Sequence, residues 1–383
     1  MPKKKVFIFG STGSIGLNAL AVLRVNTKQF AIDGLCVNCD IDALCLQIKE
    51  FKPRYVCVVN EERARAIECK IPKNVKFFKG QAGLLDFARI NCDISVMAIT
   101  GISCLRPLWE NIPFAKRIAL ANKESVVTAG RFIFAHAAKY KTEIIPVDSE
   151  INSLFQLFAC TPDFSRIWVT ASGGALFNYK KADLAKVTAQ DVLRHPTWKM
   201  GKRITVDSAT LVNKAFEVVE THEFFKVPYN DIKVVIHRES NIHAMIECAD
   251  RSVFSCMYPP DMCMPIAFSL YYPHRLVTRG VNMFDSKFSL SFEPMDEKQF
   301  PGFSLILAAA NKGYSHLAAM NAADEVAVDN FLRGKIKFTA ITDILEFVLG
   351  RCRATKIMKI DDVFCWDKWG RETAGSYIER GKK

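Results

Sequence analysis

Two acidic side chains follow an apolar run that is expected to form a buried strand. Asp148 and Glu150 flank Ser149, directly after the run at 143–147. In an extended chain, alternate residues point to the same side, so the two carboxylates can converge on one cation. Oxygen ligands of this kind suit a hard divalent ion such as Mg²⁺. The pattern is short, and a strand end with two solvated acids is the alternative.

A second polar pattern lies at 207–217. We expect a helix that begins near Ser208, on which residues three or four apart share a face. That face would carry a hydroxyl, an amide, an ammonium and a carboxylate, from Thr210, Asn213, Lys214 and Glu217. These groups can bind a metal ion and a phosphate together. The alternative is an ordinary amphipathic helix whose polar face is solvated.

Two loops add groups that suit a phosphorylated ligand. Ser172 and the two glycines after it follow a strand predicted at 167–169, and they expose backbone N–H groups beside a hydroxyl, as small-anion sites do. Farther along, His195 and Trp198 stand in a loop flanked by charged residues. Such a loop can act as a lid that excludes water from a site. A loop anchored by a buried tryptophan is the alternative.

A glycine-rich turn links the first predicted strand to the first predicted helix. Gly10, Gly13 and Gly16 follow the strand at 6–9 and open a helix at 16–25. Glycines let the backbone approach a pyrophosphate closely, and the following helix aims its N–H groups at the anion. The spacing directly after a strand therefore favours dinucleotide binding over an ordinary glycine-rich turn.

The end of the second predicted strand indicates which dinucleotide would bind. A residue at this place reads the adenosine ribose, an acid for a free 2′-hydroxyl and a base for a 2′-phosphate. This chain has Asn38, Cys39 and Asp40 here, with no lysine or arginine in the immediate loop. Asp40 therefore favours NAD.

The order of apolar runs predicts an α/β fold. The first 145 residues alternate short apolar runs with helical patterns, which is typical of βαβ units and a parallel sheet. Strands are expected there at 6–9, 32–37, 55–59, 94–99, 117–120 and 143–147. The middle of the chain is mixed, with strands expected again at 233–236 and 253–257, and the last 80 residues are helical in pattern.

A chain of 383 residues has room for two or three domains. We predict a Rossmann-like dinucleotide-binding domain at 1–148 and an α+β catalytic domain at 149–272, with a lid loop near 175–203. A linker is expected at 273–301 and a C-terminal helical domain at 302–383.

Composition narrows the class of protein and its partners. Residues are 50% hydrophobic and 24% charged, as in soluble globular proteins, and no targeting segment stands at the start, so we expect a cytoplasmic protein without a membrane partner. Thirteen cysteines, an odd number, indicate buried thiols in a reducing compartment, and the single Cys36-x-x-Cys39 lacks a second pair for zinc. The net charge of +12 is scattered and suits small phosphorylated anions better than nucleic acid.

Taken in order, these segments resemble the 1-deoxy-D-xylulose 5-phosphate reductoisomerase family, and the resemblance covers nearly the whole chain. The motifs that carry it are GSTGSIG at 10–16, LANKES at 120–125, PVDSE at 146–150, SGG at 172–174, HPTWKMGKRITVDSAT at 195–210, NKAFE at 213–217, PDM and PIA within 260–267, and MNAADEVAV at 320–328. The resemblance implies an NADPH-binding domain, a catalytic domain with a flexible lid, a helical C-terminal domain and a homodimer.

The resemblance also implies roles for residues at the motif positions. Mg²⁺ or Mn²⁺ would be held by Asp148, Glu150 and Glu217. The phosphorylated sugar substrate would contact Lys123, Ser149, Glu150, Ser172, His195, Trp198, Ser208, Asn213, Lys214 and Glu217. NADPH would contact Gly10, Thr12, Gly13, Ser14, Ile15, Gly16, Asn38, Cys39, Asp40, Asn122, Glu124 and Gly201. The catalytic candidates are Lys123, Glu150 and His195, with the base undecided between Glu150 and Lys123.

The implied reaction forms 2-C-methyl-D-erythritol 4-phosphate by a carbon-skeleton rearrangement and a hydride transfer from NADPH. Moving a carbon–carbon bond in a hydroxyketone requires a carbonyl and a neighbouring hydroxyl to be polarised together, and a divalent metal can do this. The rearranged aldehyde must then be reduced before it escapes, so the cofactor and the metal must share a closed pocket.

The chain departs from the family pattern at several positions. Ile151 stands where the family has histidine, so we expect either a reduced turnover or that His195, His237 or His243 replaces that imidazole. Ala215-Phe216 replaces Gly-Leu, and 237–240 reads HRES instead of HPQS.

The departure at Cys39-Asp40 concerns the cofactor, because the family has Lys-Asn there for the 2′-phosphate. We therefore expect weak discrimination between NADPH and NADH, or a preference for NADH. Two other functions compete with the main interpretation: a diverged metal-assisted oxidoreductase for another phosphorylated polyol, and a non-catalytic dinucleotide- or nucleic-acid-binding protein.

Overall fold

The computed structural model describes residues 2–161, 163–194, 197–198, 200–278, 283–285 and 287–380. Spatial contacts divide the chain into two compact units. The first unit comprises 1–122, 133–152 and 261–282, and the second unit comprises 123–132, 153–260 and 283–383. The units follow contacts rather than chain order, and the domain limits predicted above stay predictions.

The first unit is built on a seven-stranded parallel sheet, which confirms the predicted α/β class. Its order is β4-β3-β2-β1-β5-β6-β7, so the direction of winding reverses at β1, as in dinucleotide-binding folds. The strands are β1 (Lys4–Phe9), β2 (Phe30–Val37), β3 (Tyr55–Val58), β4 (Lys76–Lys79), β5 (Cys92–Met97), β6 (Ala115–Leu120) and β7 (Glu143–Pro146). β4 was not predicted, because its sequence, KFFK, is short and has exposed lysines at both ends.

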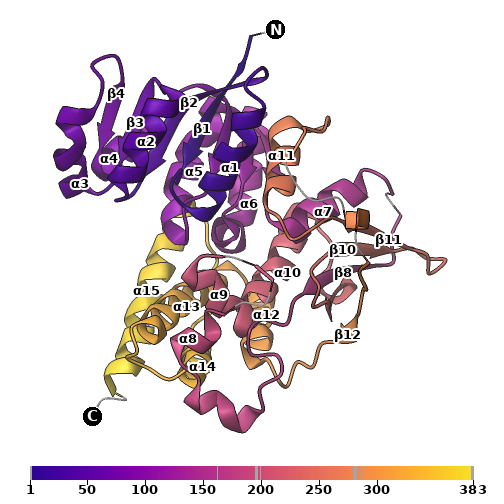
Figure 1. The fold of residues 1–383 in the computed structure, drawn as a ribbon. Coiled ribbons are helices and arrows are strands. Elements are labelled where there is room, and N and C mark those ends of the chain that lie inside the picture. The colour runs from indigo at the N-terminus through magenta and orange to yellow at the C-terminus, as the bar shows by residue number, and fades with distance from the viewer. Residues whose placement is uncertain are drawn as a thin grey trace. The chain divides into compact units, whose positions relative to one another are not determined.

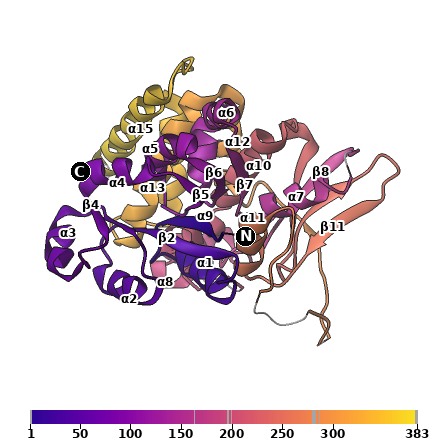
Figure 2. The same cartoon turned by 90° about the horizontal axis from the view of Figure 1, so that it is seen from above.

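Helices cover both faces of this sheet. They are α1 (Ser14–Val25), α2 (Ile41–Phe51), α3 (Glu61–Ile67), α4 (Gly80–Ala88), α5 (Leu105–Asn111) and α11 (Cys263–Tyr271), with short 3-10 turns at Glu68–Lys70, Ile102–Cys104 and Ile112–Phe114. Figure 2 shows α1 and α2 on one face and α4 and α5 on the other. Residues 6–9 of β1 are fully buried between these layers. The glycine turn therefore leaves the middle of the sheet at its carboxyl end.

The second unit contains a five-stranded sheet in the order β11-β10-β8-β9-β12. Its strands are β8 (Arg166–Ala171), β9 (Ile232–Ile236), β10 (Ile242–Glu247), β11 (Val253–Met257) and β12 (Glu293–Pro294). β8 and β9 are parallel and the other pairs are antiparallel. β10 was not predicted, and β12 lies inside the segment that was expected to be only a linker.

The helices of the second unit share one apolar core with this sheet. They are α7 (Ser149–Phe158, of which 153–158 belong here), α8 (Ala189–Val192), α9 (Lys202–Ala209), α10 (Val212–Phe225), α12 (Pro301–Lys312), α13 (Tyr314–Leu332), α14 (Thr339–Arg351) and α15 (Ile360–Arg380), with 3-10 turns at Lys181–Lys186, Tyr229–Asp231 and Met283–Asp285. α6 (Lys123–Tyr140) begins in this unit. Figure 1 shows α13 and α15, in orange and yellow, lying side by side. The helical pattern predicted for the last 80 residues is confirmed.

Two expectations about the chain's surroundings can be compared with the structure. Among the described residues, no helix is long and apolar enough to cross a bilayer. All thirteen cysteines lie in the described part of the chain as free thiols. The expectation that they are buried is wrong for Cys39, Cys69, Cys160 and Cys365, which are exposed.

Candidate active site

The acidic pair lies where β7 passes into α7. β7 ends at Pro146 and α7 begins at Ser149, so Glu150 is in the first helical turn. The expectation of an extended chain here is therefore wrong. The backbone N–H of Glu150 donates to Asp148 Oδ1 at 3.3 Å, and the Ser149 hydroxyl donates to Glu150 Oε2. A helix start, rather than strand alternation, orients the two carboxyl groups.

The segment 202–225 forms two helices instead of the single helix that was predicted. α9 ends at Ala209 and α10 begins at Val212, because Leu211 takes a left-handed conformation with φ of 54°. Ser208 therefore lies near the end of a helix, not at its start. Thr210 does not join the predicted polar face, since its hydroxyl donates to the carbonyl groups of residues 206 and 207.

Glu217 on α10 is almost fully buried and is surrounded by donors. Asn213 Nδ2 donates to Glu217 Oε1 at 2.5 Å, and Lys123 Nζ, from the first turn of α6, donates to the same oxygen at 2.8 Å. Lys214 Nζ donates to Glu217 Oε2. Both lysines are buried, with 6% and 3% of their surface exposed, and Glu217 is 2% exposed. The alternative of a solvated polar face is wrong.

Asp148, Glu150 and Glu217 form a group that could hold a metal ion. Each offers one carboxylate oxygen, and these oxygens all lie within 4.8 Å of one another. Oxygen-only ligands are the chemistry that Mg²⁺ and Mn²⁺ prefer. The donor set therefore fits the divalent ion that was expected at these three residues.

The predicted anion loop packs against the end of α9. The N–H of Gly174 donates to Ser172 Oγ at 3.3 Å, and Gly174 has a left-handed φ of 71°. A Cβ atom at Gly174 would lie 2.6 Å from the carbonyl oxygen of Ser208. Glycine is thus required for this close approach, which makes Ser172 and Ser208 neighbours in one loop-and-helix corner.

The predicted lid is only partly described. His195 and Lys199 lie outside the described residues, so nothing is stated of their structure. Trp198 is half-buried, and its ring centroid lies 5.9 Å from that of His243. The segment before it is not a plain loop, since it contains the 3-10 turn at 181–186 and the short helix α8. The role of Trp198 stays a prediction.

The glycine turn has the geometry of a phosphate loop. The N–H groups of Gly10 and Ser11 donate to the Cys36 carbonyl at 2.8 and 2.9 Å, which ties the turn to the end of β2. A Cβ atom at Gly16 would lie only 2.2 Å from the Gly10 carbonyl oxygen, so a side chain there would force the turn open. α1 begins at Ser14, earlier than predicted, with Gly13 as an N-cap that offers no side chain. The first N–H groups of α1 have no partner within the helix and can bind an anion.

Residues 38–40 are exposed at the carboxyl end of β2, beside the glycine turn. Asp40 is the N-cap of α2, and its Oδ1 accepts a hydrogen bond from the Ala43 N–H at 3.1 Å. The sequence interpretation missed this structural role. Asp40 therefore serves to cap α2, and its contact with a ribose stays a prediction.

Three other predicted cofactor residues have internal partners. Asn122 Nδ2 donates to the carbonyl oxygens of Ile99 and Gly101 at 3.0 and 3.1 Å. The Glu124 carboxylate lies 3.2 Å from the guanidinium of Arg203. Gly201 precedes α9 and accepts a hydrogen bond from the Thr205 hydroxyl. Their contacts with a cofactor stay predictions.

Several of the departures from the family pattern occupy buried positions, whereas Cys39 and Asp40 are exposed. Ile151 is fully buried, and Phe216 packs in the core of the second unit. His237 Nε2 accepts hydrogen bonds from two backbone N–H groups at 3.1 Å, so its proton is on Nδ1, which donates to the Ser291 carbonyl at 2.8 Å. Both ring nitrogens are used, and His237 is a poor replacement for the missing imidazole. His243 Nε2 lies 3.1 Å from the Tyr258 carbonyl oxygen.

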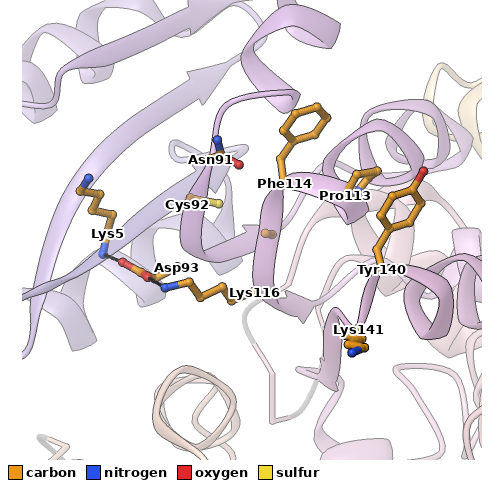
Figure 3. A pocket seen from close by; sticks show the side chains of 10 residues that line it. Lys5, Asn91, Cys92, Asp93, Pro113, Phe114, Lys116, Tyr140 and Lys141 are labelled. Atoms are coloured by element: carbon orange, nitrogen blue, oxygen red, sulfur yellow. Dashed lines mark hydrogen bonds and ion pairs between the residues drawn. The ribbon is translucent and has the colours of Figure 1, made fainter.

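A separate hollow of about 420 Å³ lies at the amino ends of β1, β5 and β6. Figure 3 shows Asp93 in it between Lys5 and Lys116. Asp93 accepts hydrogen bonds from the Lys5 backbone N–H at 2.8 Å and from Lys116 Nζ at 2.7 Å. None of the predicted site residues lines this hollow, which is at the opposite end of the strands from the glycine turn.

Comparisons with known proteins agree with this geometry. Three family models match: 1-deoxy-D-xylulose 5-phosphate reductoisomerase over residues 6–130, its C-terminal domain over 144–225, and a further DXP reductoisomerase C-terminal domain over 257–373. The chain is 42% identical over 373 residues to the 1-deoxy-D-xylulose 5-phosphate reductoisomerase of Caldanaerobacter subterraneus, covering 96% of this chain and 98% of that protein. The chain belongs to the 1-deoxy-D-xylulose 5-phosphate reductoisomerase family.

Other members of the family extend the comparison. The reductoisomerase of Thermodesulfovibrio yellowstonii is also 42% identical, over 380 residues that cover 98% of this chain and 99% of that protein. The reductoisomerase of Zymomonas mobilis in complex with NADPH superposes with a TM-score of 0.91 at 30% identity, covering 99% and 100% of the two chains. A reductoisomerase in complex with NADPH, fosmidomycin and magnesium gives a TM-score of 0.92 at 29% identity, covering 99% of both chains.

Proposed function

We propose that this chain is the enzyme that converts 1-deoxy-D-xylulose 5-phosphate to 2-C-methyl-D-erythritol 4-phosphate with a reduced nicotinamide and a divalent metal ion. The observation that carries the proposal is the buried Glu217, oriented by Lys123, Lys214 and Asn213 and grouped with two further carboxylates. A protein that only binds dinucleotides or nucleic acid has no use for such a group. Family membership over nearly the whole chain supports the same conclusion.

We assign the metal ion to Asp148, Glu150 and Glu217. A bound divalent ion would supply the Lewis acid that polarises the carbonyl and the hydroxyl of the substrate. Lys123 holds Glu217 in place, and the Ser149 hydroxyl does the same for Glu150. Glu150 and Lys123 are the two candidates for accepting the proton of the substrate hydroxyl.

We assign the substrate phosphate to the corner formed by Ser172, the glycines after it and Ser208, with Asn213 and Lys214 on α10. Hydroxyl and backbone N–H donors in such a corner bind phosphate oxygens without competing for the metal. Anchoring the phosphate supplies binding energy that orients the reacting carbons. Trp198, in the predicted lid, would cover the substrate and exclude water.

We assign the dinucleotide to the glycine turn of β1 and α1, with Thr12, Ser14 and Ile15 at its tip. The N–H groups at the start of α1 would bind the pyrophosphate, and the cofactor when bound supplies the hydride. Two solved relatives are in complex with NADPH. At Cys39 and Asp40, however, this chain has no base for a 2′-phosphate, so we propose that it also uses NADH.

The test of the activity is direct. Purified protein is incubated with deoxyxylulose phosphate, Mn²⁺ and either NADPH or NADH, and the loss of absorbance of the dihydronicotinamide is followed. Turnover that stops with EDTA and returns with Mg²⁺ or Mn²⁺ is expected. Oxidation of neither cofactor would contradict the proposal and favour an enzyme for another phosphorylated polyol, which the same assay can screen.

We further propose that the protein is a homodimer that pairs through the edge of the five-stranded sheet. β11 is an edge strand, and Val253 and Phe254 on it are 53% and 48% exposed. An exposed apolar edge strand is prone to pair with a second copy. Phe254→Asp should give monomers in light scattering, while Met358→Asp, at another exposed apolar residue, should leave the dimer intact. A monomeric parent protein would contradict this proposal.

We place the enzyme in the cytoplasm, in a reducing environment. The thirteen free thiols support this, since four of them are exposed and would be open to oxidation elsewhere. Localisation of a tagged protein by cell fractionation tests this placement, and recovery outside the cytoplasm would contradict it.

A further inference from the structure

Arg203, in the first turn of α9, is surrounded by carboxylates from three helices. Its guanidinium contacts Glu124 of α6 at 3.2 Å, Asp207 of α9 at 3.6 Å, and Asp324 and Glu325 of α13 at 3.5 and 2.8 Å. It also donates to the Asn321 side chain at 3.2 Å. Arg203 thus joins α9 to the start of α6 and to the middle of α13.

A second arginine extends this cluster to the last helix. Arg371 of α15 donates to Glu325 and, at 2.8 Å, to Asp367. Glu325 is therefore shared by the two guanidinium groups, whereas Arg371 makes no contact with α9 among the described interactions. The cluster therefore contains two arginines: Arg203 belongs to α9, whereas Arg371 has no described contact with it.

The cluster is under electrostatic strain. Arg203 Nε, Asp207 Oδ1 and Asp324 Oδ1 are buried without a hydrogen-bond partner. Burial raises the pKa of Asp324 to about 6, and burial with the neighbouring carboxyl of Asp324 raises the pKa of Asp207 well above its usual range. Buried polar groups without partners cost free energy, so the cluster is retained at the expense of stability.

The position of α9 explains what the cluster could do. α9 carries Ser208 near its end, against the Ser172–Gly174 loop, and it follows directly after the segment with Trp198. At the start of α6, Glu124 holds α9 through Arg203, and its neighbour Lys123 holds Glu217 of α10. Two consecutive residues thus fix the two helices that carry the proposed phosphate and metal residues.

We propose that Arg203 is a positioning residue for the phosphate group of the substrate: by pairing with Glu124, Asp324 and Glu325 it holds α9 so that Ser208 meets the Ser172–Gly174 loop. The inference rests on the proposed function, because it takes this corner as the phosphate site. Arginine suits this position because its planar fork presents five N–H donors in fixed directions to several carboxylates, whereas the ammonium of lysine has only three donors on a flexible stem.

The test compares Arg203→Lys with Arg371→Lys. Both keep the charge in the same cluster, but only the first loosens α9. For Arg203→Lys we expect two constants to rise about tenfold, the KM for deoxyxylulose phosphate and the inhibition constant of inorganic phosphate, since small displacements of a binding group are costly. The kcat and the KM for the cofactor should stay nearly unchanged. Arg371→Lys should change neither phosphate constant. Equal effects of the two variants, or a fall in kcat alone, would overturn the proposal.

A further variant covers the case in which Arg203→Lys does not fold. Glu325→Gln keeps Arg203 but weakens its shortest ion pair, and it should raise the same two constants in the same direction. Unchanged constants in folded Glu325→Gln would overturn the proposal. If the parent protein does not turn over the sugar phosphate, the proposed function fails by itself. Calorimetric binding of inorganic phosphate to parent and variants still tests the role of Arg203.

Discussion

The glycine turn and the α9–α10 region, which are the two proposed anion sites, are built by different means. The turn is a backbone structure, in which Gly10 and Gly16 are in close contact and the donors are N–H groups. The α9–α10 region is a side-chain structure, in which Glu217 and Arg203 are each surrounded by opposite charges from distant parts of the sequence. The glycine turn depends on the space around the Gly10 carbonyl oxygen. The α9–α10 region depends on the balance of buried charges.

This difference predicts two kinds of sensitivity to mutation. A backbone site should fail when a methyl group is added and should tolerate changes of charge nearby. A buried charge cluster should fail when one charge is removed, because the remaining partners are left uncompensated in a medium of low polarity.

The largest effect is expected from Glu217→Gln. The change keeps the side-chain volume but leaves the ammonium groups of Lys123 and Lys214 without their shared carboxylate. We expect turnover to fall about a thousandfold, since a proposed metal ligand is lost, and the free energy of unfolding to fall by about 3 kcal/mol. Steady-state assays and urea denaturation measure the two effects.

Glu223→Gln is the matched control on the same helix. Glu223 is also buried, and it accepts hydrogen bonds from the Tyr314 hydroxyl at 2.5 Å and from Lys226 at 3.3 Å. This variant should lose stability but keep the turnover of the protein that folds. If both variants lost turnover equally, buried charge in general rather than Glu217 would be the cause.

The next effect tests the backbone site. Gly16→Ala places a Cβ atom 2.2 Å from the Gly10 carbonyl oxygen, whereas Gly13→Ala places one at 3.4 Å from the same atom, which is ordinary contact. We expect Gly16→Ala to lower the melting temperature and to raise the KM for the cofactor about a hundredfold. The melting temperature of Gly13→Ala should stay close to that of the parent protein. Similar melting of the two variants would show that space at Gly16 does not limit the turn.

A smaller effect concerns the choice of cofactor. Asp40→Asn removes a charge at the end of β2 but keeps a good N-cap for α2, since asparagine and aspartate cap equally well. The ratio of kcat/KM for NADPH to that for NADH should rise about tenfold. Asp42→Asn, an exposed acid in the first turn of the same helix, should leave the ratio unchanged. A parent enzyme that already prefers NADPH a hundredfold would contradict the role of Asp40.

The smallest effect is a change in the pH dependence of stability. Burial raises the pKa of Asp324 to about 6, so between pH 4 and 6 the folded protein keeps a proton that the unfolded chain releases. The stabilisation from this proton is complete at low pH and is lost as the pH rises through about 6. Asp324→Asn does not titrate, so its melting temperature should fall less than that of the parent over this range. If calorimetry gave the same change of melting temperature with pH for the parent and for Asp324→Asn, this prediction would be wrong.

The sequence predicted the backbone site better than the charge clusters. The glycine turn is local: strand, turn and helix follow one another, and only the helix start at Ser14 was misplaced. The prediction that Asp148 and Glu150 group with Glu217 is confirmed, because their carboxylate oxygens lie close together. The extended backbone predicted for Asp148 and Glu150 was wrong, since α7 begins at Ser149. Residue types can thus indicate chemistry even where the local backbone is misjudged.

The clusters themselves could not be predicted, because they depend on contacts between distant segments. Nothing near Glu217 in sequence points to Lys123, and nothing near Arg203 points to Glu325. One signal was available: Asp324 and Glu325 stand inside the largely apolar run at 320–328, and acids in a buried helix need partners. The break between α9 and α10 also escaped prediction, since leucine does not favour a left-handed conformation.

That break has a mechanical consequence. Leu211 is almost completely buried in the core of the second unit, although its left-handed backbone costs about 1 kcal/mol. Burying a leucine side chain contributes about 2 kcal/mol, so the packing outweighs the strain. A change in the angle between α9 and α10 would pull this side chain out of the core. The joint is therefore a rigid elbow that holds α9 and α10 at a fixed angle to each other.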